Sequence, residues 1–239
     1  MKYEKIISGI FLERPNRFIA YVEIQGKRET VHVKNTGRCR ELLVPGCTVI
    51  MEDFRDRPGF ENRKTKFDLI AVYKKIDKNH PLYNQSTQSE SLLINMDSQA
   101  PNKVVLEWLN SLSGIQAYDY IKPEYTFGNS RVDFYMEKNN QKYLMEVKGC
   151  TLEKNGQGFF PDAPTERGVK HLKELAAASK QGIKCFLAFV IQIPGVKEVF
   201  PNIETHPEFG TALKEAKAAG VEVLFLQCQV QEDKLIIKN

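Results

Sequence analysis

Arg131-Val132-Asp133-Phe134-Tyr135-Met136 begins the stretch that decides the fold, and Tyr143-Leu144-Met145-Glu146-Val147-Lys148-Gly149 completes it. Side chains of a β-strand alternate between its two faces, so Arg131, Asp133 and Tyr135 should share one face and Val132, Phe134 and Met136 the other. The polar residues 137–142 between the segments predict a hairpin turn. Pairing of the two strands would bring Asp133 beside Glu146 and Lys148, which share a face because they are two residues apart.

The residue types of this hairpin suit chemistry at a phosphate. Asp133 and Glu146 supply carboxylate oxygens, which Mg²⁺ or Mn²⁺ prefers as ligands. Lys148 beside such a metal would position an attacking water or stabilise charge on the phosphate. The pattern alone also fits an exposed strand face that carries a salt bridge, so the neighbouring segments must decide.

Charge is distributed unevenly along the 239 residues, which suffice for one large domain or two small ones. Residues 1–85 contain 17 Lys and Arg against 11 Asp and Glu, a net charge of +6. Residues 86–239 contain 17 against 19, a net charge of −2. A basic first part is typical of proteins that bind an anionic polymer, although such charge also serves solubility.

The sequence predicts a cytoplasmic protein that does not enter a membrane. Its apolar runs are too short to span a bilayer, and its first residues lack the apolar region of a signal peptide. The five cysteines are scattered without a C-x-x-C pair, so they predict neither a zinc site nor a disulfide framework. The oligomeric state stays open, a homo-oligomer included.

Residues 1–85 predict an all-β domain. Short strand-like runs occupy residues 6–12, 18–25, 29–33, 48–53 and 67–75, and turns rich in Gly, Pro and Asn separate them. Five strands of this length suit a small β-barrel such as an OB-fold. A small barrel of another topology is the alternative.

Residues 86–239 predict an α/β domain that follows a polar linker at 81–90. Helical spacing of apolar residues begins at Pro101 and recurs at 166–180 and 207–219. Nearly continuous apolar runs at 184–191 and 221–227 predict buried strands. With a strand at 115–127 and the charged hairpin, the order becomes α-β-β-β-α-β-α-β. Residues 92–95 could begin this domain or return to the first one.

This order of elements resembles the core of the PD-(D/E)xK nuclease superfamily. The resemblance implies that Asp133 and Glu146 bind the metal and that Lys148 lies beside the scissile phosphate. It also implies a further Glu from the first helix, for which Glu107 is the candidate. Glu107 equally fits a solvated helix residue.

The segment that follows the hairpin adds candidate phosphate contacts. Thr165 suits the N-cap of a helix, and Arg167 and His171 lie four residues apart on one helical face. A helix N-terminus attracts phosphate, so Arg167 and His171 are candidate nucleic-acid contacts, with a solvated helix face as the alternative. Gly168 is a poor helix residue and indicates that a ligand or another part of the chain comes close.

Several motifs together resemble the sugar fermentation stimulation protein A family. They are Arg131-Val132-Asp133-Phe134, Glu146-Val147-Lys148, Gln157-Gly158-Phe159-Phe160-Pro161-Asp162-Ala163, Thr165-Glu166-Arg167-Gly168-x-x-His171-Leu172, Asn35-Thr36-Gly37, Leu93-Ile94-Asn95 and Gly220-Val221-Glu222-Val223. The resemblance covers nearly the whole chain. It implies an OB-fold joined to a PD-(D/E)xK domain, a cytoplasmic bacterial or archaeal protein, DNA binding, and a link to the regulation of sugar use, maltose in particular.

The barrel has its own candidates for DNA contact. Lys34, Arg38 and Arg40 flank one turn, and Arg63, Lys64 and Lys66 form a second basic cluster. Each phosphate contact would strengthen the salt dependence of binding without reading sequence. Phe60 and Phe67 could stack on bases, with a place in the barrel core as the alternative.

Three functions follow from these observations. The first is a DNA-binding protein with a metal-dependent nuclease site formed by Asp133, Glu146 and Lys148. The second is a DNA-binding transcriptional regulator that keeps a nuclease fold without turnover. The third, a carbohydrate-binding regulator, has little support, because the one tryptophan, Trp108, falls in a predicted helix away from the barrel.

Overall fold

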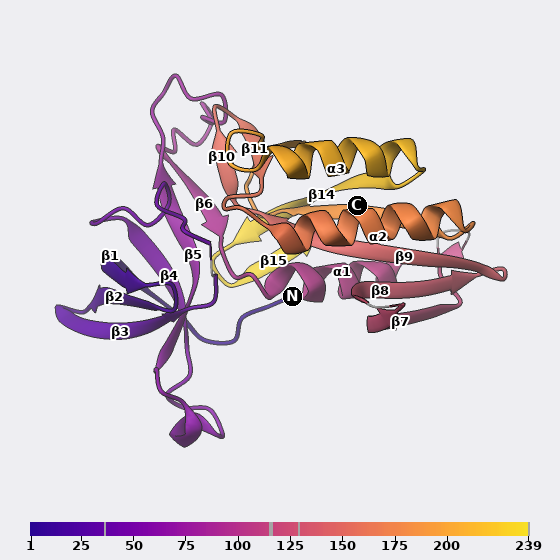
Figure 1. The fold of residues 1–239 in the computed structure, drawn as a ribbon. Coiled ribbons are helices and arrows are strands. Elements are labelled where there is room, and N and C mark those ends of the chain that lie inside the picture. Colours follow the sequence, from indigo (N-terminus) through magenta and orange to yellow (C-terminus); the bar gives the residue numbers. More distant parts are fainter. Residues whose placement is uncertain (36, 115–116, 129, 239) are drawn as a thin grey trace.

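The computed structural model describes residues 1–35, 37–114, 117–128 and 130–238. Within these residues, the first unit is a closed barrel of five strands (Figure 1). The strands are β1 (Ile6–Asn16), β2 (Ile19–Ile24), β3 (Lys27–Val33), β4 (Thr48–Asp53) and β5 (Phe67–Lys75). Antiparallel pairs give the order β3-β2-β1-β4-β5, and a parallel pairing of β3 with β5 closes the barrel. The predicted small barrel is confirmed.

Strand β6 (Ser91–Asn95) resolves an alternative that the sequence left open. It pairs antiparallel with β5 and so returns to the barrel sheet. Helix α1 (Ala100–Ser111) begins after residues 96–99, which carry the chain into the second unit. The domain boundary at residue 85 stays a prediction, because β6 lies beyond it and still pairs with the barrel.

The second unit is built on a mixed sheet of order β15-β14-β12-β9-β8-β7. Its central strands β9 (Gln141–Cys150), β12 (Lys184–Ile191) and β14 (Glu222–Gln231) run parallel. The outer strands β8 (Ser130–Lys138), β7 (Tyr120–Phe127) and β15 (Lys234–Ile237) are antiparallel to their neighbours. Central parallel strands are buried on both faces, which explains the continuous apolar run of β12.

Helices cover both faces of this sheet (Figure 1). Helices α2 (Glu166–Lys180) and α3 (Pro207–Ala218) pack on one face, where Leu175 and Leu213 share a core with Leu187 of β12. Helix α1 packs on the other face, where Val105 shares a second core with Val147. The unit is therefore a three-layer α/β/α sandwich, as the alternation of helices and strands predicts.

The hairpin between β8 and β9 turns within two residues. Asn139 and Asn140 have φ angles of 48° and 62°, the left-handed values that a type I′ turn requires at both central positions. Asparagine tolerates this conformation better than most residues. The turn lies inside the predicted span of residues 137–142.

A small second sheet follows β9 in the chain. Strands β10 (Leu152–Lys154) and β11 (Gln157–Phe160) form a hairpin, and β13 (Val199–Pro201) pairs parallel with β11. Neither these strands nor β15 was predicted. Strands of three or four residues are too short to show a clear alternation of polar and apolar residues.

The first residues of the chain belong to the second unit. Lys2 forms a bridge with Lys234, and the N–H of Tyr3 donates to the carbonyl of Asp233 over 2.8 Å. The chain therefore contacts β15 before it enters the barrel at β1. Two segments, one before β1 and one after β6, connect the barrel to the second unit.

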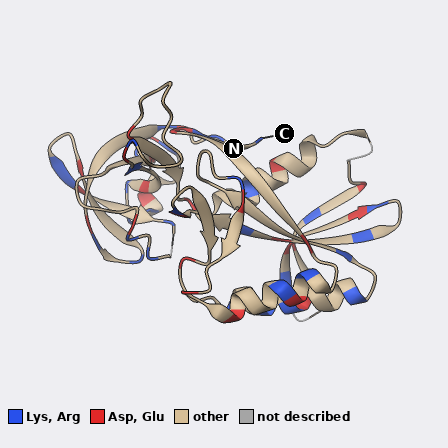
Figure 2. Cartoon of the chain, turned by 90° about the horizontal axis from the view of Figure 1, so that it is seen from above, with Lys and Arg blue, Asp and Glu red and all other residues tan. Residues whose placement is uncertain are grey.

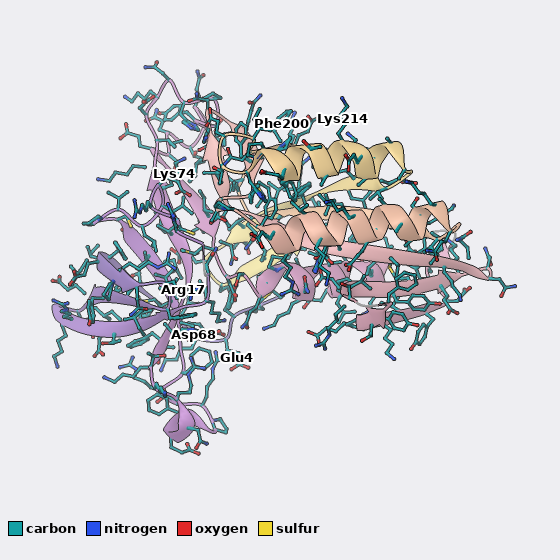
Figure 3. The ribbon with its side chains drawn as sticks, viewed as in Figure 1. Glu4, Arg17, Asp68, Lys74, Phe200 and Lys214 are labelled. Atoms are coloured by element: carbon teal, nitrogen blue, oxygen red, sulfur yellow. The ribbon has the colours of Figure 1, made fainter. Side chains whose placement is uncertain are left out.

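A buried ion pair also joins the units, near the place where Figure 3 labels Lys74. Lys74 Nζ lies 2.5 Å from Oε2 of Glu153, whose other oxygen lies 3.1 Å from Nε2 of His80. Glu153 is 2% exposed. Burial raises the pKa of Glu153, but the hydrogen bond from Lys74 and that from the Gly156 N–H outweigh this effect and lower the pKa.

Charged residues of both signs lie on both units (Figure 2). Among the described residues, no helix is long and apolar enough to cross a membrane.

Candidate active site

Asp133 lies where strands β8 and β9 separate. The last paired residues of the two strands are Phe134 and Met145, and Asp133 is the first residue of β8 beyond this pairing. Its carboxylate then takes the place of a backbone partner, because Oδ2 accepts from the Val147 N–H over 2.7 Å. Oδ1 accepts from Nδ2 of Asn102, on α1, over 2.8 Å.

The expected alternation of β8 is wrong at this point. Val132 packs in the core on the α2–α3 side, whereas Phe134 and Met136 pack in the core on the α1 side. Opposite, the β7 register passes from Pro123 directly to Tyr125, and Glu124 between them has a φ of 53°. The register is the same on either side, so the irregularity is confined to the missing Glu124–Asp133 pair, where the Asp133 carboxylate contacts β9 instead.

Glu146 is held by a chain of polar side chains. It is 2% exposed, and its Oε1 accepts from Lys148 Nζ over 2.5 Å. The same oxygen contacts Nδ1 of His171, on α2. Arg167 Nε donates to Nε2 of His171 over 3.3 Å. Glu146 is therefore held by Lys148 from its own strand and by His171 from α2.

The two carboxylates differ in their electrostatics. Burial raises the pKa of Asp133, and the negative charge of Glu146 raises it further. Burial also raises the pKa of Glu146, but the hydrogen bonds from His171 and Lys148 outweigh this effect and lower the pKa. Asp133 is therefore the carboxylate with the uncompensated charge.

The first turns of α2 place His171 in contact with Glu146. Thr165 Oγ1 accepts from the Gly168 N–H over 3.0 Å and caps the helix. A Cβ on Gly168 would lie 2.8 Å from Cγ2 of Thr165 and 3.4 Å from the ring of Phe209. Glycine at this position therefore leaves room for Thr165 and for Phe209 of α3 to pack against the first turn of α2.

The carboxylate pair suits a hard divalent cation. Mg²⁺ commonly takes one or two protein carboxylates together with waters and substrate phosphate oxygens. A cation would also relieve the repulsion that raises the pKa of Asp133. Among the described residues there is no cluster of three or more His, Cys, Asp or Glu that could hold a metal ion.

Family models match both units of the chain. The model described as the SfsA N-terminal OB domain matches residues 12–80, and the model described as the sugar fermentation stimulation protein RE domain matches residues 99–234. The chain belongs to the sugar fermentation stimulation protein family. The OB-type barrel and the family that the motifs suggested are thereby confirmed.

Individual proteins agree with this assignment. A sugar fermentation stimulation protein homolog from Desulfitobacterium hafniense (strain Y51) is 52% identical over 98% of this chain and 94% of its own. A homolog from Clostridium beijerinckii is 49% identical over 100% of this chain and 97% of its own. The solved structure of Pyrococcus furiosus SfsA in complex with Ca²⁺ has a TM-score of 0.79 and 26% identity, and the match covers 100% of this chain and 96% of that one.

Two predicted site residues of the second unit lie elsewhere than expected. Glu107 is exposed and forms an ion pair with the α-amino group of Met1 over 2.6 Å, so α1 offers Asn102 to Asp133 instead. His171 is 8% exposed, and both ring nitrogens have side-chain partners, so it positions Glu146 rather than facing a phosphate. Arg167 is exposed and stays a candidate nucleic-acid contact.

The predicted DNA contacts of the barrel divide into side chains that have partners within the protein and side chains that are exposed. Lys34 is buried against Asp97 over 3.0 Å and is not available to a ligand. Arg63 pairs with Asp68, Lys66 pairs with Glu29 and Phe67 lies in the barrel core, so these side chains have structural partners. The exposed candidates are Arg38, Arg40, Lys64 and Lys66, the last of which also pairs with Glu29.

The barrel carries a basic pocket that joins the predicted Arg38 and Arg40 to Arg14 and Arg17, which the sequence did not single out. The pocket has a volume of about 370 Å³, and Arg14, Arg17, Arg38 and Arg40 contribute to its lining. The guanidinium of Arg14 donates to the backbone carbonyls of residues 17, 35, 37 and 38, which holds the two loops of the pocket together. Phe18 beside it is 47% exposed, with Arg17 5.2 Å from its ring. Arg14 lies in β1 and Arg17 directly after it, and only the fold brings them beside Arg38 and Arg40.

Replacing Asp133 with asparagine should stabilise the fold in the absence of divalent cations. The pKa of Asp133 is raised above 3.8, so the folded state binds this proton more tightly than the unfolded chain does. The ionised carboxylate therefore destabilises the fold increasingly as the pH rises through and above the pKa of aspartate in the unfolded chain. Asparagine carries no charge and still accepts from Val147.

Thermal unfolding between about pH 4 and pH 8 would measure this effect. We expect the Tm of Asp133→Asn to exceed that of the wild type by a few degrees at neutral pH, with the difference shrinking toward pH 4. The exposed Asp56→Asn serves as the control and should change little. A lower Tm for Asp133→Asn at neutral pH would contradict the assigned electrostatics.

Proposed function

We propose that this protein binds DNA and cleaves phosphodiester bonds with Mg²⁺ or Mn²⁺ at the Asp133–Glu146 pair. The observation that carries the proposal is the meeting of the buried Glu146 and the half-buried Asp133 with Lys148 where β8 and β9 separate. Residues from β8, β9, α1 and α2 converge there, which a simple surface salt bridge would not require.

Each residue has a separate role in the proposed reaction. A bound metal would supply Lewis acidity and lower the pKa of a coordinated water. Asp133 and Glu146 would hold it, with Asn102 and the Val147 N–H orienting the first carboxylate and His171 the second. Lys148 places a positive charge beside the pair, where it stabilises the charge that develops on the phosphate.

The Ca²⁺ complex of Pyrococcus furiosus SfsA supports a cation site in this chain. Ca²⁺, Mg²⁺ and Mn²⁺ are all hard cations with a preference for oxygen ligands. A family member that binds one of them is compatible with carboxylate ligands that suit the others.

The barrel supplies the proposed DNA-binding surface. Arg38 and Arg40 are exposed at the basic pocket, and Lys64 is exposed on the long loop between β4 and β5. Phe18 beside the pocket offers an exposed aromatic ring on which a base can stack. The net charge of +6 in residues 1–85 agrees with this role.

The test is incubation of the protein with plasmid DNA, single-stranded oligonucleotides and RNA, each with Mg²⁺, Mn²⁺ or a chelator. We expect metal-dependent cleavage of DNA that a chelator abolishes. Cleavage that persists in Asp133→Ala and Lys148→Ala would show that the site is assigned wrongly or that a contaminant acts.

A DNA-binding regulator without turnover is the second candidate. The exposed arginine pocket favours it, because that pocket can hold a phosphate backbone without the carboxylate pair. The family name, which refers to sugar fermentation, also suits a regulator. Equal DNA affinity with and without metal, together with no cleavage of any substrate, would select this candidate.

Replacing Arg38 or Arg40 with glutamine should reduce the salt dependence of DNA binding. Each phosphate contact contributes about 0.9 to the slope of log affinity against log salt, so each variant should lower that slope by about one. Fluorescence anisotropy with a labelled duplex across a salt series measures it. The control is Lys214→Gln on α3 in the second unit (Figure 3), which should leave the slope unchanged.

A further inference from the structure

A cavity of about 170 Å³ lies at the junction of the barrel and the second unit. The barrel contributes Asn35 and Gly37, and the second unit contributes Gly149, Thr151, Asp162 and Gln192. None of the functions discussed above uses this space.

The cavity adjoins the carboxylate pair through the chain itself. Gly149 follows Lys148 directly on β9. Pro101, which also lines the cavity, directly precedes Asn102, the hydrogen-bond partner of Asp133. The cavity and the carboxylate pair are therefore built from consecutive residues of β9 and of α1.

Polar atoms with free hydrogen-bonding capacity line the cavity. Gln192 is 1% exposed, and its Nε2 donates to Asn95 and to the Asp97 carbonyl, while its Oε1 has no hydrogen bond among the described residues. The hydroxyl of Thr151, which is 8% exposed, likewise has none within the described ranges. Both oxygens are therefore available to a polar ligand or to water in the cavity.

Close contacts limit the size of the cavity. A Cβ on Gly149 would lie 2.5 Å from Gln192 Oε1, and one on Gly37 would overlap the carboxylate of Asp162. Phe159 and Phe160 add aromatic surface. A protein cavity of about 150 Å³ accommodates benzene, so this one has room for a single six-membered ring.

We propose that the cavity binds a pyrimidine base of the strand whose phosphate lies at the Asp133–Glu146 pair. This inference rests on the proposed function. Proteins that hold a base outside the helical stack read its hydrogen-bonding edge with polar side chains and place aromatic or apolar groups on its faces. Gln192 Oε1 can accept a hydrogen bond, Asn35 Nδ2 can donate one, and the Thr151 hydroxyl can do either. A pyrimidine base carries both donors and acceptors along its pairing edge, so these groups can bind it.

Binding calorimetry with dCMP, dTMP and dAMP tests the cavity itself. We expect one or both pyrimidine nucleotides to bind more tightly than dAMP. Thr151→Val keeps the size of the side chain and should weaken pyrimidine binding about fivefold, the usual effect of losing one hydrogen bond. Thr126→Val, on exposed β7, is the matched control and should bind as the wild type does. If Thr151→Val unfolds, Asp162→Asn repeats the test.

A second measurement separates this inference from the proposed function. We compare oligothymidylate with the same strand carrying abasic nucleotides in place of half its thymidines, and expect weaker binding of the abasic strand. If oligothymidylate binding depends on Asp133 but not on Thr151 or on the bases, the cavity proposal fails and the proposed function stands. Binding of glucose or maltose that Thr151→Val abolishes, or no binding of any nucleotide, also overturns it. Pyrimidine binding that depends on Thr151 supports it even if no strand is cut.

Discussion

Replacing Lys148 with methionine should slow metal-dependent cleavage by about 10²–10³-fold, as removal of a single charge-stabilising donor does in other enzymes. Lys148 Nζ lies 2.5 Å from Glu146, so its charge acts where the phosphate would be held. Methionine keeps the length of the side chain without its charge. Lys142→Met, an exposed lysine of the same strand, is the matched control and should cut DNA at the rate of the wild type.

Metal binding separates the role of Lys148 from that of the carboxylates. Calorimetry with Mn²⁺ should show binding by Lys148→Met and none by Glu146→Gln, because only the second change removes a ligand. If both variants bind Mn²⁺ and cut DNA as the wild type does, the carboxylate pair is not the active site.

Replacing Lys74 with methionine should destabilise the protein by about 3 kcal/mol, because it leaves Glu153 buried without its main partner. For a chain of this size the loss corresponds to a fall in Tm of about 6–12 °C. Glu153 keeps only His80 and the Gly156 N–H, and its pKa should rise toward or above 4.5 once Lys74 is gone. Thermal unfolding at neutral pH measures the change.

Two further variants test whether the lost ion pair causes the change in Tm. Lys75→Met changes the exposed neighbouring lysine of β5 and should alter the Tm by no more than about 1–2 °C, as surface substitutions do. The double variant Lys74→Met with Glu153→Gln removes both charges and should recover part of the lost stability. A double variant less stable than Lys74→Met would show that the glutamate contributes mainly through other contacts.

The sequence predicted the fold well where periodic patterns are long. The continuous apolar run of β12 and the helical spacing of α2 each marked an element at its observed bounds, since burial on both faces and burial on one face leave different patterns. The strands β10, β13 and β15 left no such pattern because each has only three or four residues.

The site was predicted in part. Asp133, Glu146 and Lys148 were expected together, and the structure brings them together. Asn102 was missed because its role depends on the packing of α1 against the end of β8, which no local pattern encodes. His171 was expected to face a phosphate, but the capped start of α2 turns it toward Glu146.

The two connections between the barrel and the second unit have a consequence for how a polymer would be held. A domain on a single linker swivels freely, whereas one attached through both Tyr3 at β15 and residues 96–99 after β6 has its orientation restricted at two points. A strand that lies on the barrel arginines would therefore meet the carboxylate pair at a nearly constant spacing. The entropy of aligning the two surfaces is lost when the chain folds, so a strand that bound both surfaces would not have to supply it.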